Sequence, residues 1–570
     1  MIARKEKRRL GDLLVEAGVL SNDKLSEALE LQHESKELLG IILVKNNFVS
    51  EDDIITAMQN QLHIQRVALD DIVIGENIIN RYNDVTSMKQ NVFVPFKLEN
   101  GVLYIAMSDP MNTMVIDDVS TVCGCKVVPC VAKQSEIAAS IDRYYGSEQV
   151  RSILNEINES EYKPVETVEA TEDISDDNPI VRLVTSFFEQ AVHLRASDIH
   201  IEPLKSHVRV RYRVDGDLVD SGTQYGSNYL HAIITRIKVL GGMNIAERRR
   251  PQDGRITQII DGVEYDVRVS ILPSVYGEKI VMRITNKDNL TMQKKDLGLF
   301  PDDEQKLDDL LSNSHGILLV TGPTGSGKST TLYTALSELN RIEVNITTIE
   351  DPVEANIDGL TQVQINEKAG LTFPIALRTF LRQDPDIIMV GEIRDVETAN
   401  LAIDAALTGH LVVSTLHTNN SVSSISRLQK MGIESYLLAD ALVGVVAQRL
   451  VKRLCVCKKE HKATRIEKIK LGVDKDKDLT IYEPCGCVKC NNTGYLGRIG
   501  VYEIFTITDV IRNMIIDEKP VNEIETAATA EGLVTLRKSA ARLIIDGVTT
   551  VAEMDRIVHD SSIFAEEEIE

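Results

Sequence analysis

The sequence contains no tryptophan, and only 4% of its residues are aromatic. Channels that bind single-stranded nucleic acid stack bases on aromatic side chains, so this scarcity argues against that class of protein. Positive charge is also in deficit, because 63 Lys and Arg residues face 86 Asp and Glu residues and leave a net charge of −23. Affinity for phosphate backbones depends on cations that displace counterions, so we expect no nucleic-acid partner.

Long apolar runs are missing as well. No segment approaches the roughly 18 apolar residues that a membrane span requires. The basic start of the chain is followed by Asp12 and Glu16, where a signal peptide would need an apolar core. We therefore expect a cytoplasmic protein.

Cysteine is scarce, with eight residues in a chain of 570, which excludes a disulfide scaffold. Hydrophobic residues make up 43% and charged residues 26%, a balance typical of soluble domains with real cores. At roughly 150 residues per domain, the length predicts three or four domains.

An internal repeat occupies the first sixty residues. The segment Arg9–Gln32 recurs as Leu38–Gln61, shifted by 29 positions. Each copy has the pattern of a helix, a turn and a second helix, with Ser21 and Ser50 placed to cap the second helix. The residues alone favour two helical hairpins that pack together.

Two further regions precede the strongest motif. Residues 65–145 have the pattern of a compact α/β unit, in which Cys123, Cys125 and Cys130 are expected to be buried thiols. Nine acidic residues between Glu156 and Asp177 indicate a solvated linker.

Strand and turn signals follow the linker. After a helix over 180–194, the residues from Val208 to Val214 alternate apolar side chains inward with Arg209, Arg211 and Arg213 outward. Asp261-Gly262 predicts a hairpin turn. The segment is therefore a mixed α/β domain.

The strongest motif is a glycine-rich loop between a strand over 317–321 and a helix that begins near Lys328. This is the P-loop pattern in its strand–loop–helix context. Its glycines let backbone N–H groups face phosphates, Lys328 would reach the β- and γ-phosphates, and Ser329 would bind Mg²⁺. We predict that a nucleoside triphosphate is bound by Gly322, Pro323, Thr324, Gly325, Ser326, Gly327, Lys328, Ser329 and Thr330.

Three more apolar strands end near polar residues. Glu392 follows the strand over 387–390 and is expected to position the attacking water. Glu350 ends the strand over 344–349 and would support the metal and water, unless that end is only a solvated turn. His410 and His417 flank the strand over 411–414 and would contact phosphate, with structural histidines as the alternative.

The P-loop and the strand-end motifs that follow it, in this order, resemble those of the secretion ATPase superfamily of type II secretion and type IV pilus machines. The resemblance covers essentially the whole chain. It is carried by RASDIHIEP (195–203), RRPQDGRI (249–256), ITTIEDPVE (346–354), LRQDPDIIMVGEIRD (381–395) and TGHLVVSTLHTN (408–419).

The resemblance implies a multidomain α/β fold in a hexameric ring, with a RecA-like P-loop NTPase core. It implies that arginines of the middle domain complete the ATP-binding site. Arg268, Arg283 and Arg255 are the candidates; the alternative is that each only pairs with a neighbour such as Asp266 or Glu264. The expected domains are residues 1–148 for the N-terminal region (with the helical repeat at 1–62), 149–178 for the linker, 179–293 for the middle domain and 294–570 for the ATPase domain, which carries a cysteine insert at 455–490.

The implied function is ATP hydrolysis that powers type IV pilus assembly, with type II secretion as the alternative. The long N-terminal region and the cysteine cluster resemble assembly motors, whereas retraction motors generally lack both. A polytopic inner-membrane platform protein and a membrane-anchored adaptor are the implied partners. The rival classes are a nucleic-acid motor, with Arg209, Arg211 and Arg213 in its groove, and a non-hydrolysing regulatory subunit.

Five of the eight cysteines lie between Cys455 and Cys490. The spacing Cys487-x-x-Cys490 lets two thiolates share one tetrahedral ion. With Cys455 and Cys457 they form our predicted Zn²⁺ site, for which Cys485 or His461 could substitute; a reduced, metal-free thiol cluster is the alternative.

The N-terminal repeat resembles a cyclic-di-GMP-binding motif found in some relatives of this superfamily. The second copy departs from it, with Leu38 in the arginine position and Asn47 in the second glycine position. The residues implied in binding are Arg9, Gly11, Leu14, Gly18, Leu25, Gln32, Gly40, Leu43 and Gln61.

Overall fold

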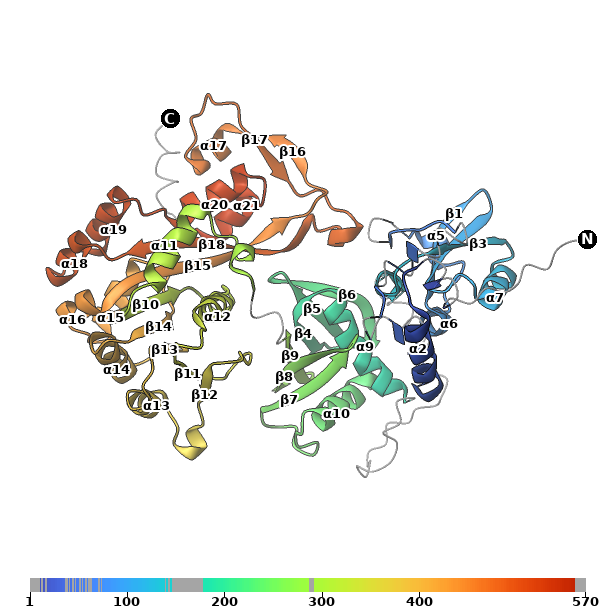
Figure 1. Cartoon of the computed structure of the whole chain (residues 1–570), viewed down its shortest axis with the longest axis horizontal. Helices are drawn as coiled ribbons and strands as arrows, with labels where there is room; N and C mark the ends of the chain where they lie inside the picture. The colour runs from blue at the N-terminus through green and yellow to red at the C-terminus, as the bar shows by residue number, and fades with distance from the viewer. Residues whose placement is uncertain are drawn as a thin grey trace, which may run out of the picture. The chain divides into compact units, whose positions relative to one another are not determined.

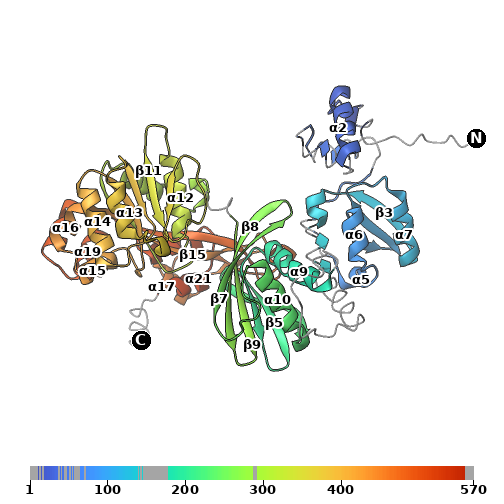
Figure 2. The ribbon, with the colours of Figure 1, turned by 90° about the horizontal axis from the view of Figure 1, so that it is seen from below.

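The computed structural model describes residues 178–286 and 292–558, most of residues 64–145, residues 18–35, and scattered other positions between residues 11 and 59. The chain divides into two compact units, residues 1–284 and 285–570. Figures 1 and 2 show their ribbons from two directions. Within the described residues, no helix is long and apolar enough to cross a bilayer.

The repeat at the N-terminus has the helix caps that its serines predict. The Ser21 hydroxyl accepts the N–H of Lys24 at 3.4 Å, just before α2 (Asn22–Ser35), and the Ser50 hydroxyl accepts the N–H of Asp53 at 3.2 Å. The described apolar residues of the repeat form a small core, to which Val131 of the following α/β unit also contributes.

The α/β unit that follows is built on a three-stranded sheet in the order β1-β2-β3. Strand β1 is antiparallel to β2, whereas β3 is parallel to β2. Cys123 and Cys130 are buried as predicted, and Cys125 is half-buried. The elements are α5 (Glu76–Ile79), α6 (Val85–Asn91), β1 (Phe93–Glu99), β2 (Val102–Met107), α7 (Thr113–Cys123) and β3 (Lys126–Val131).

The middle domain is a six-stranded sheet in the order β6-β5-β4-β9-β8-β7. Helices α9 and α10 cover one face, where apolar side chains of the strands form a core with them (Figure 2). Asp261 and Gly262 both have positive φ and join β7 to β8, so the predicted hairpin is confirmed. The elements are α9 (Pro179–His193), β4 (Ala196–Pro203), β5 (His207–Val214), β6 (Asp217–Gly226), α10 (Leu230–Leu240), β7 (Gln252–Ile260), β8 (Val263–Ser274) and β9 (Gly277–Asn286).

The C-terminal unit contains a seven-stranded sheet in the order β12-β11-β13-β14-β10-β15-β18. Its strands are parallel except β18, which runs antiparallel to β15. Separate apolar cores lie on its two faces, so helices cover both sides (Figure 1). Every residue of β10 is buried, as expected for a central parallel strand.

The elements of this unit that position the site are α11 (Pro301–Leu311), β10 (Gly316–Thr321), α12 (Lys328–Leu339), β11 (Ile346–Glu350), β12 (Thr361–Gln364), α13 (Phe373–Phe380), β13 (Ile387–Val390), α14 (Val396–Leu407), β14 (Leu411–Leu416), α15 (Ser423–Lys430) and α16 (Ser435–Ala441). The remainder comprises β15 (Leu442–Leu454), β16 (Lys459–Lys462), α17 (Arg465–Leu471), β17 (Thr480–Glu483), β18 (Tyr495–Thr506), α18 (Asp509–Ile516), α19 (Val521–Ala530), α20 (Leu536–Ile545) and α21 (Val551–Ile557).

A buried ion pair stabilises the middle domain. Lys238 on α10 is only 1% exposed, and its Nζ lies 2.7 Å from Glu278 Oε1. The same ammonium donates to the carbonyl of Glu247 at 2.7 Å. Both charges are therefore removed from water and depend on each other.

We expect Lys238→Met to destabilise the middle domain by about 3–5 kcal/mol, because it leaves the buried Glu278 charge without its partner. Hydrogen–deuterium exchange of the α10 amides in the full chain measures this as a loss of protection. Lys205→Met, at an exposed lysine, is the control. Equal protection in Lys238→Met and the unmodified chain would contradict the prediction.

Candidate functional site

The P-loop occupies the turn between β10 and α12. Gly322, Gly325 and Gly327 all have positive φ, and a Cβ on Gly322 would lie 2.5 Å from the carbonyl oxygen of Gln448. Gly327 begins α12 without any side-chain cap from the described residues. The first N–H groups of this helix are therefore free to bind an anion.

Lys328 folds back over this loop. Its Nζ donates to the carbonyls of Gly322 at 2.9 Å and Pro323 at 3.1 Å. Burial lowers the pKa of Lys328, while the nearby Glu392 opposes that shift. The two carbonyls that accept from this ammonium are uncharged. Phosphate oxygens can replace them and would supply the negative charge that forms a stronger, charge-assisted hydrogen bond.

The other predicted loop residues differ in exposure. Pro323, Thr324, Gly325 and Ser329 are exposed, and Thr330 is half-buried. Ser326 is buried, and its hydroxyl has no partner within the described residues. Ser329 is thus accessible for the metal contact expected of it.

Glu392 lies at the same edge of the sheet as the P-loop. Strand β13 runs parallel to β14, with Val390 opposite Ser414, and ends just before Gly391-Glu392. The Glu392 carboxylate pairs with Arg394 and lies 3.8 Å from His417 Nε2. The predicted water-positioning carboxylate is therefore close to the lysine and to one histidine.

Two threonines that the sequence analysis missed join the histidine loop to the P-loop. The Thr321 and Thr418 hydroxyls share a hydrogen bond, and Thr418 N–H donates to Thr321 Oγ1 at 3.0 Å. Their signal in the sequence is a hydroxyl at the end of each of two adjacent apolar strands. The neighbouring His417 has its pKa lowered by burial and by the charge of Lys328.

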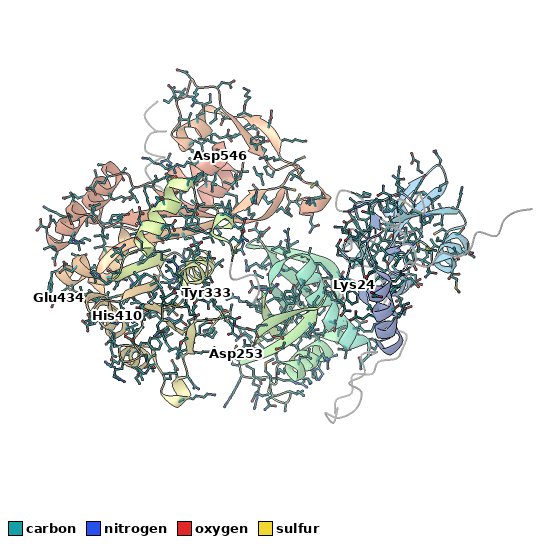
Figure 3. The ribbon with its side chains drawn as sticks, viewed as in Figure 1. Lys24, Asp253, Tyr333, His410, Glu434 and Asp546 are labelled. Atoms are coloured by element: carbon teal, nitrogen blue, oxygen red, sulfur yellow. The ribbon has the colours of Figure 1, made fainter. Side chains whose placement is uncertain are left out.

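His410 does not belong to this site, so its prediction as a nucleotide ligand was wrong. Its carbonyl accepts the N–H of Gly316 at the start of β10, and its Nδ1 lies 2.8 Å from the carbonyl of Ala405. Because β10 and β14 are parallel, residues that flank one strand lie at opposite edges of the sheet, here about 20 Å apart. Figure 3 labels His410 and, on α12, Tyr333.

Glu350 ends β11 as a buried carboxylate that three donors already satisfy. The Tyr333 hydroxyl donates to it, as do Thr348 Oγ1 at 2.6 Å and Gln362 Nε2 at 3.2 Å. A Cβ on Gly391 would lie 3.3 Å from the Glu350 Cα, so glycine permits the close approach of the two strand ends. Glu350 is thus held rigidly beside Glu392.

The candidate arginines of the middle domain all lie near buried carboxylates. Arg255 donates to both oxygens of Asp266, with Nη2 at 2.8 Å, and Arg268 Nε lies 3.9 Å from the same carboxylate. Arg283 Nε donates to Asp198 at 3.0 Å. A guanidinium has five N–H donors, so these hydrogen bonds orient Arg255 and Arg283 and leave donors for a phosphate.

Two further arginines and a lysine of the middle domain share one buried carboxylate. Arg209 and Arg211 both donate to Glu202, and Lys279 lies 3.0 Å from it. Burial would raise the pKa of Glu202, but these three cations lower it to about 2. Glu202 therefore orients three cations whose summed charge stays positive.

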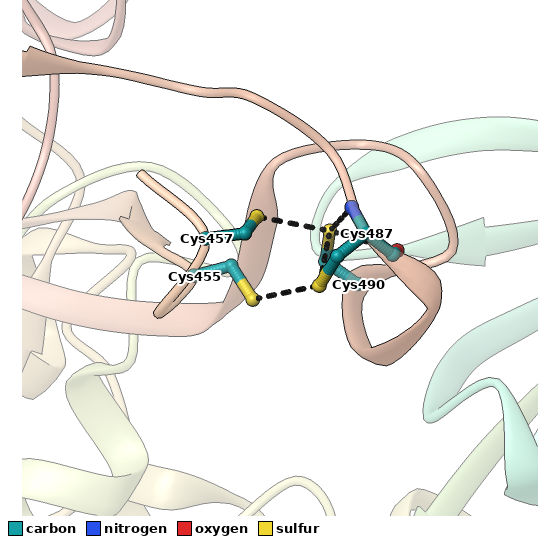
Figure 4. Close-up of side chains that lie close together, drawn as sticks. All are labelled: Cys455, Cys457, Cys487 and Cys490. Carbon is teal, nitrogen blue, oxygen red and sulfur yellow. Dashed lines mark hydrogen bonds between the residues drawn. The ribbon is translucent and has the colours of Figure 1, made fainter. Parts of the chain in front are cut away.

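The four cysteines chosen from the sequence come together in two loops (Figure 4). All four Sγ atoms lie within 4.8 Å of one another. The separations are 3.7 Å for Cys455–Cys487, 3.8 Å for Cys457–Cys490 and 3.7 Å for Cys487–Cys490. Zinc–thiolate bonds of about 2.3 Å in a tetrahedron require about 3.8 Å between sulfur atoms, so the cluster fits Zn²⁺.

The two substitutes lie outside this cluster. Cys485 is exposed and is not a member of the group. The His461 ring instead lies 3.0 Å from Glu467 and 3.4 Å from Glu483. N–H groups of Cys487 and Gly494 donate to Cys490 Sγ and, against the effect of burial, lower its pKa to about 7.

In the N-terminal repeat, the motif residues that are described have packing roles. Leu14 and Leu43 are completely buried, and a Cβ on Gly11 would lie 2.5 Å from Leu25 Cδ1. Gly18 has positive φ, and Gln32 is half-buried. The other implied ligands, Arg9, Gly40 and Gln61, lie outside the described residues.

A buried strand, a P-loop, a helix and a carboxylate on a neighbouring parallel strand define a P-loop NTPase with a RecA-like α/β core. Comparison with known families extends this assignment: the model of the type II/IV secretion system protein family matches residues 173–556. The chain belongs to this family, and it is an ATPase. The MshEN domain matches residues 62–151, the α/β unit that follows the repeat.

Two relatives align along nearly the whole chain. The type IV pilus assembly ATPase PilB of Myxococcus xanthus is 39% identical over 96% of this chain and 98% of its own length. The type II secretion system protein E of Xanthomonas campestris is also 39% identical, over 98% of this chain and 100% of its own length. Among solved structures, the ATPase DotB of Yersinia pseudotuberculosis shares the fold, with a TM-score of 0.50 and 22% identity over 66% of this chain and 93% of that one.

We expect the chain, purified without chelators under reducing conditions, to contain one Zn²⁺ and to lose it in Cys487→Ser. The reason is that three thiolates hold the ion much more weakly than four. Elemental analysis measures the zinc content. Cys485→Ser, which removes a thiol outside the cluster, is the control and should keep the ion; zinc loss only in that variant would contradict the assignment.

Proposed function

We propose that this ATPase powers type IV pilus assembly as a hexamer, by converting hydrolysis into the extraction and polymerisation of pilin. The observation that carries the proposal is one edge of one sheet, where Lys328, Glu392 and His417 meet in a chain that aligns end to end with a pilus assembly ATPase. These are the groups that phosphoryl transfer needs: a cation for the phosphates and a carboxylate for the water.

The residues would act in the following way. Backbone N–H groups of the P-loop and the Lys328 ammonium hold the phosphates, and Ser329 would hold Mg²⁺. Bound Mg²⁺ neutralises charge on the β- and γ-phosphates. Glu392 orients the attacking water, and Glu350, held by Tyr333 and Thr348, keeps the adjacent strand end in place.

Arginines of the middle domain complete the proposed site. Arg268 and Arg283, with Arg255 next to them, would place guanidinium groups on the γ-phosphate and stabilise the charge that develops during transfer. Asp266 and Asp198 hold them in defined orientations beforehand. Loss of the γ-phosphate would release these contacts and so couple hydrolysis to domain movement.

The proposed partners are those implied by the similarity to pilus assembly and type II secretion ATPases. The motor would act at the inner face of the cell membrane through a polytopic platform protein, with a membrane-anchored adaptor as a further partner. Zinc at the cysteine cluster would have a structural role, and cyclic-di-GMP at the N-terminal repeat would regulate the motor.

Type II secretion is the second candidate, because the type II secretion relative is as similar as the pilus relative. Deletion of the gene in its host distinguishes them. Loss of surface pili with an unchanged set of secreted proteins supports pilus assembly, whereas loss of secreted proteins with intact pili supports secretion.

We expect Glu392→Gln to lower the kcat of ATP hydrolysis at least about 100-fold while ATP binding persists, because the amide cannot accept a proton from the attacking water. Steady-state phosphate release by the full chain measures the effect. Glu434→Gln, at an exposed carboxylate in the same unit, is the control. Unchanged turnover in Glu392→Gln would show that another group positions the water.

We expect cyclic-di-GMP to bind the full chain and Arg9→Ala to weaken that binding at least about tenfold, because a guanidinium both stacks on guanine and pairs with phosphate. Isothermal titration calorimetry measures the affinity. Arg8→Ala, at the neighbouring arginine, is the matched control. Equal affinities in the two variants would remove Arg9 from the site, and no binding by the unmodified chain would leave the repeat as a docking module.

A further inference from the structure

One buried cation beside the P-loop has no anionic partner in the described part of the chain. Arg449 follows Gln448 on β15, just beyond the point where Ala447 pairs with Thr321 at the end of β10. The Arg449 side chain is nine-tenths buried. Its guanidinium donates only to backbone carbonyls, those of Gln448 at 3.1 Å and Asn419 at 2.6 Å.

The carboxylate that acts electrostatically on Arg449 is already engaged elsewhere. Glu503 contributes a favourable electrostatic interaction to Arg449 but is not in contact with it. The Glu503 carboxylate accepts hydrogen bonds from the Ser421 N–H at 2.8 Å, the Ser421 hydroxyl at 2.5 Å and the Leu536 N–H at 2.9 Å. Burial accordingly lowers the pKa of Arg449, a sign that its charge is incompletely compensated.

The guanidinium lies directly against the phosphate-binding loop. A Cβ on Gly322 would lie 3.1 Å from Arg449 Nη1. The charge of Arg449 also reaches Lys328, whose pKa it helps to lower. Through Asn419 the same side chain holds the loop that carries His417 and Thr418.

We propose that Arg449 is a positioning residue that fixes the histidine loop against the P-loop and whose uncompensated charge makes the site favour ATP over ADP. The proposal rests on the proposed nucleotide site, because the phosphates supply the counter-charge that the protein lacks. A buried unpaired charge is costly, so the additional negative charge of the γ-phosphate is worth more here than in water. Arg449 would act from behind the P-loop without touching the nucleotide, so Lys328 would still make the direct contact with the phosphates.

Four full-length variants test the proposal. Equilibrium binding of ADP and of a non-hydrolysable ATP analogue is measured with Mg²⁺ for the unmodified chain, Arg449→Gln, Arg449→Lys, Arg453→Gln and Lys328→Ala. Arg453 is an exposed arginine on the same strand and provides the matched control. Circular dichroism establishes that each variant is folded.

We expect Arg449→Gln to weaken the binding of the ATP analogue about tenfold but the binding of ADP only about threefold, because the effect of a fixed charge grows with the charge of the ligand. Arg449→Lys keeps the charge, so it should retain the preference for the analogue to within about twofold. Arg453→Gln should bind both nucleotides like the unmodified chain.

An unchanged ratio of the two affinities in folded Arg449→Gln would overturn the inference, since the loss of a purely structural residue would weaken the binding of both nucleotides alike. Loss of the preference in folded Arg449→Lys would overturn it as well, even if Arg449→Gln does not fold. Nucleotide binding by the unmodified chain that persists undiminished in Lys328→Ala would instead overturn the proposed site itself.

Discussion

The parallel alignment of β11, β13, β14 and β10 is the constraint on which the rest of the site depends. Parallel strands end at one edge of a sheet, so groups that are far apart in the sequence meet there without any contact in the intervening chain. The P-loop follows β10, Glu392 follows β13, and His417 and Thr418 follow β14. Residues that precede a parallel strand lie at the far edge, and His410, just before β14, lies there.

Glycines and buried carboxylates further fix the positions of the groups at these sites. Gly322 admits the Gln448 carbonyl and the Arg449 guanidinium, and Gly391 admits the end of β11. In the middle domain, Asp198 and Asp266 hold the candidate arginines in defined orientations. Both devices reduce the freedom of charged groups before a nucleotide binds, and preorganised charge is the main contribution that a protein makes to phosphoryl transfer.

Local patterns in the sequence predict much of this structure. The P-loop, the hairpin at Asp261-Gly262 and the caps at Ser21 and Ser50 each depend on residues within a few positions of one another, so spacing alone predicts them. The position of Glu392 also followed from a short apolar strand and the acid after it.

Contacts between distant segments could not be predicted in this way. The error at His410 arose because the sequence does not say whether the strand after it runs parallel to β10, and the parallel direction puts its start at the far edge. The Thr321–Thr418 pair joins strands 97 positions apart, and the Arg449–Asn419 contact joins residues 30 positions apart. The carboxylate that orients Arg283 was equally invisible, since Asp198 lies 85 positions upstream on a strand that only the sheet places beside it.

The central claim is that one edge of one sheet binds the phosphates of ATP, and equilibrium binding of Mg-ATP to Lys328→Ala tests it most directly. Removal of the ammonium leaves the loop backbone intact but takes away its direct positive charge. The account predicts that Lys328→Ala binds Mg-ATP at least about 100-fold more weakly than the unmodified chain, while Lys430→Ala, at an exposed lysine, binds it equally well. Equal affinity in Lys328→Ala and the unmodified chain would contradict the account.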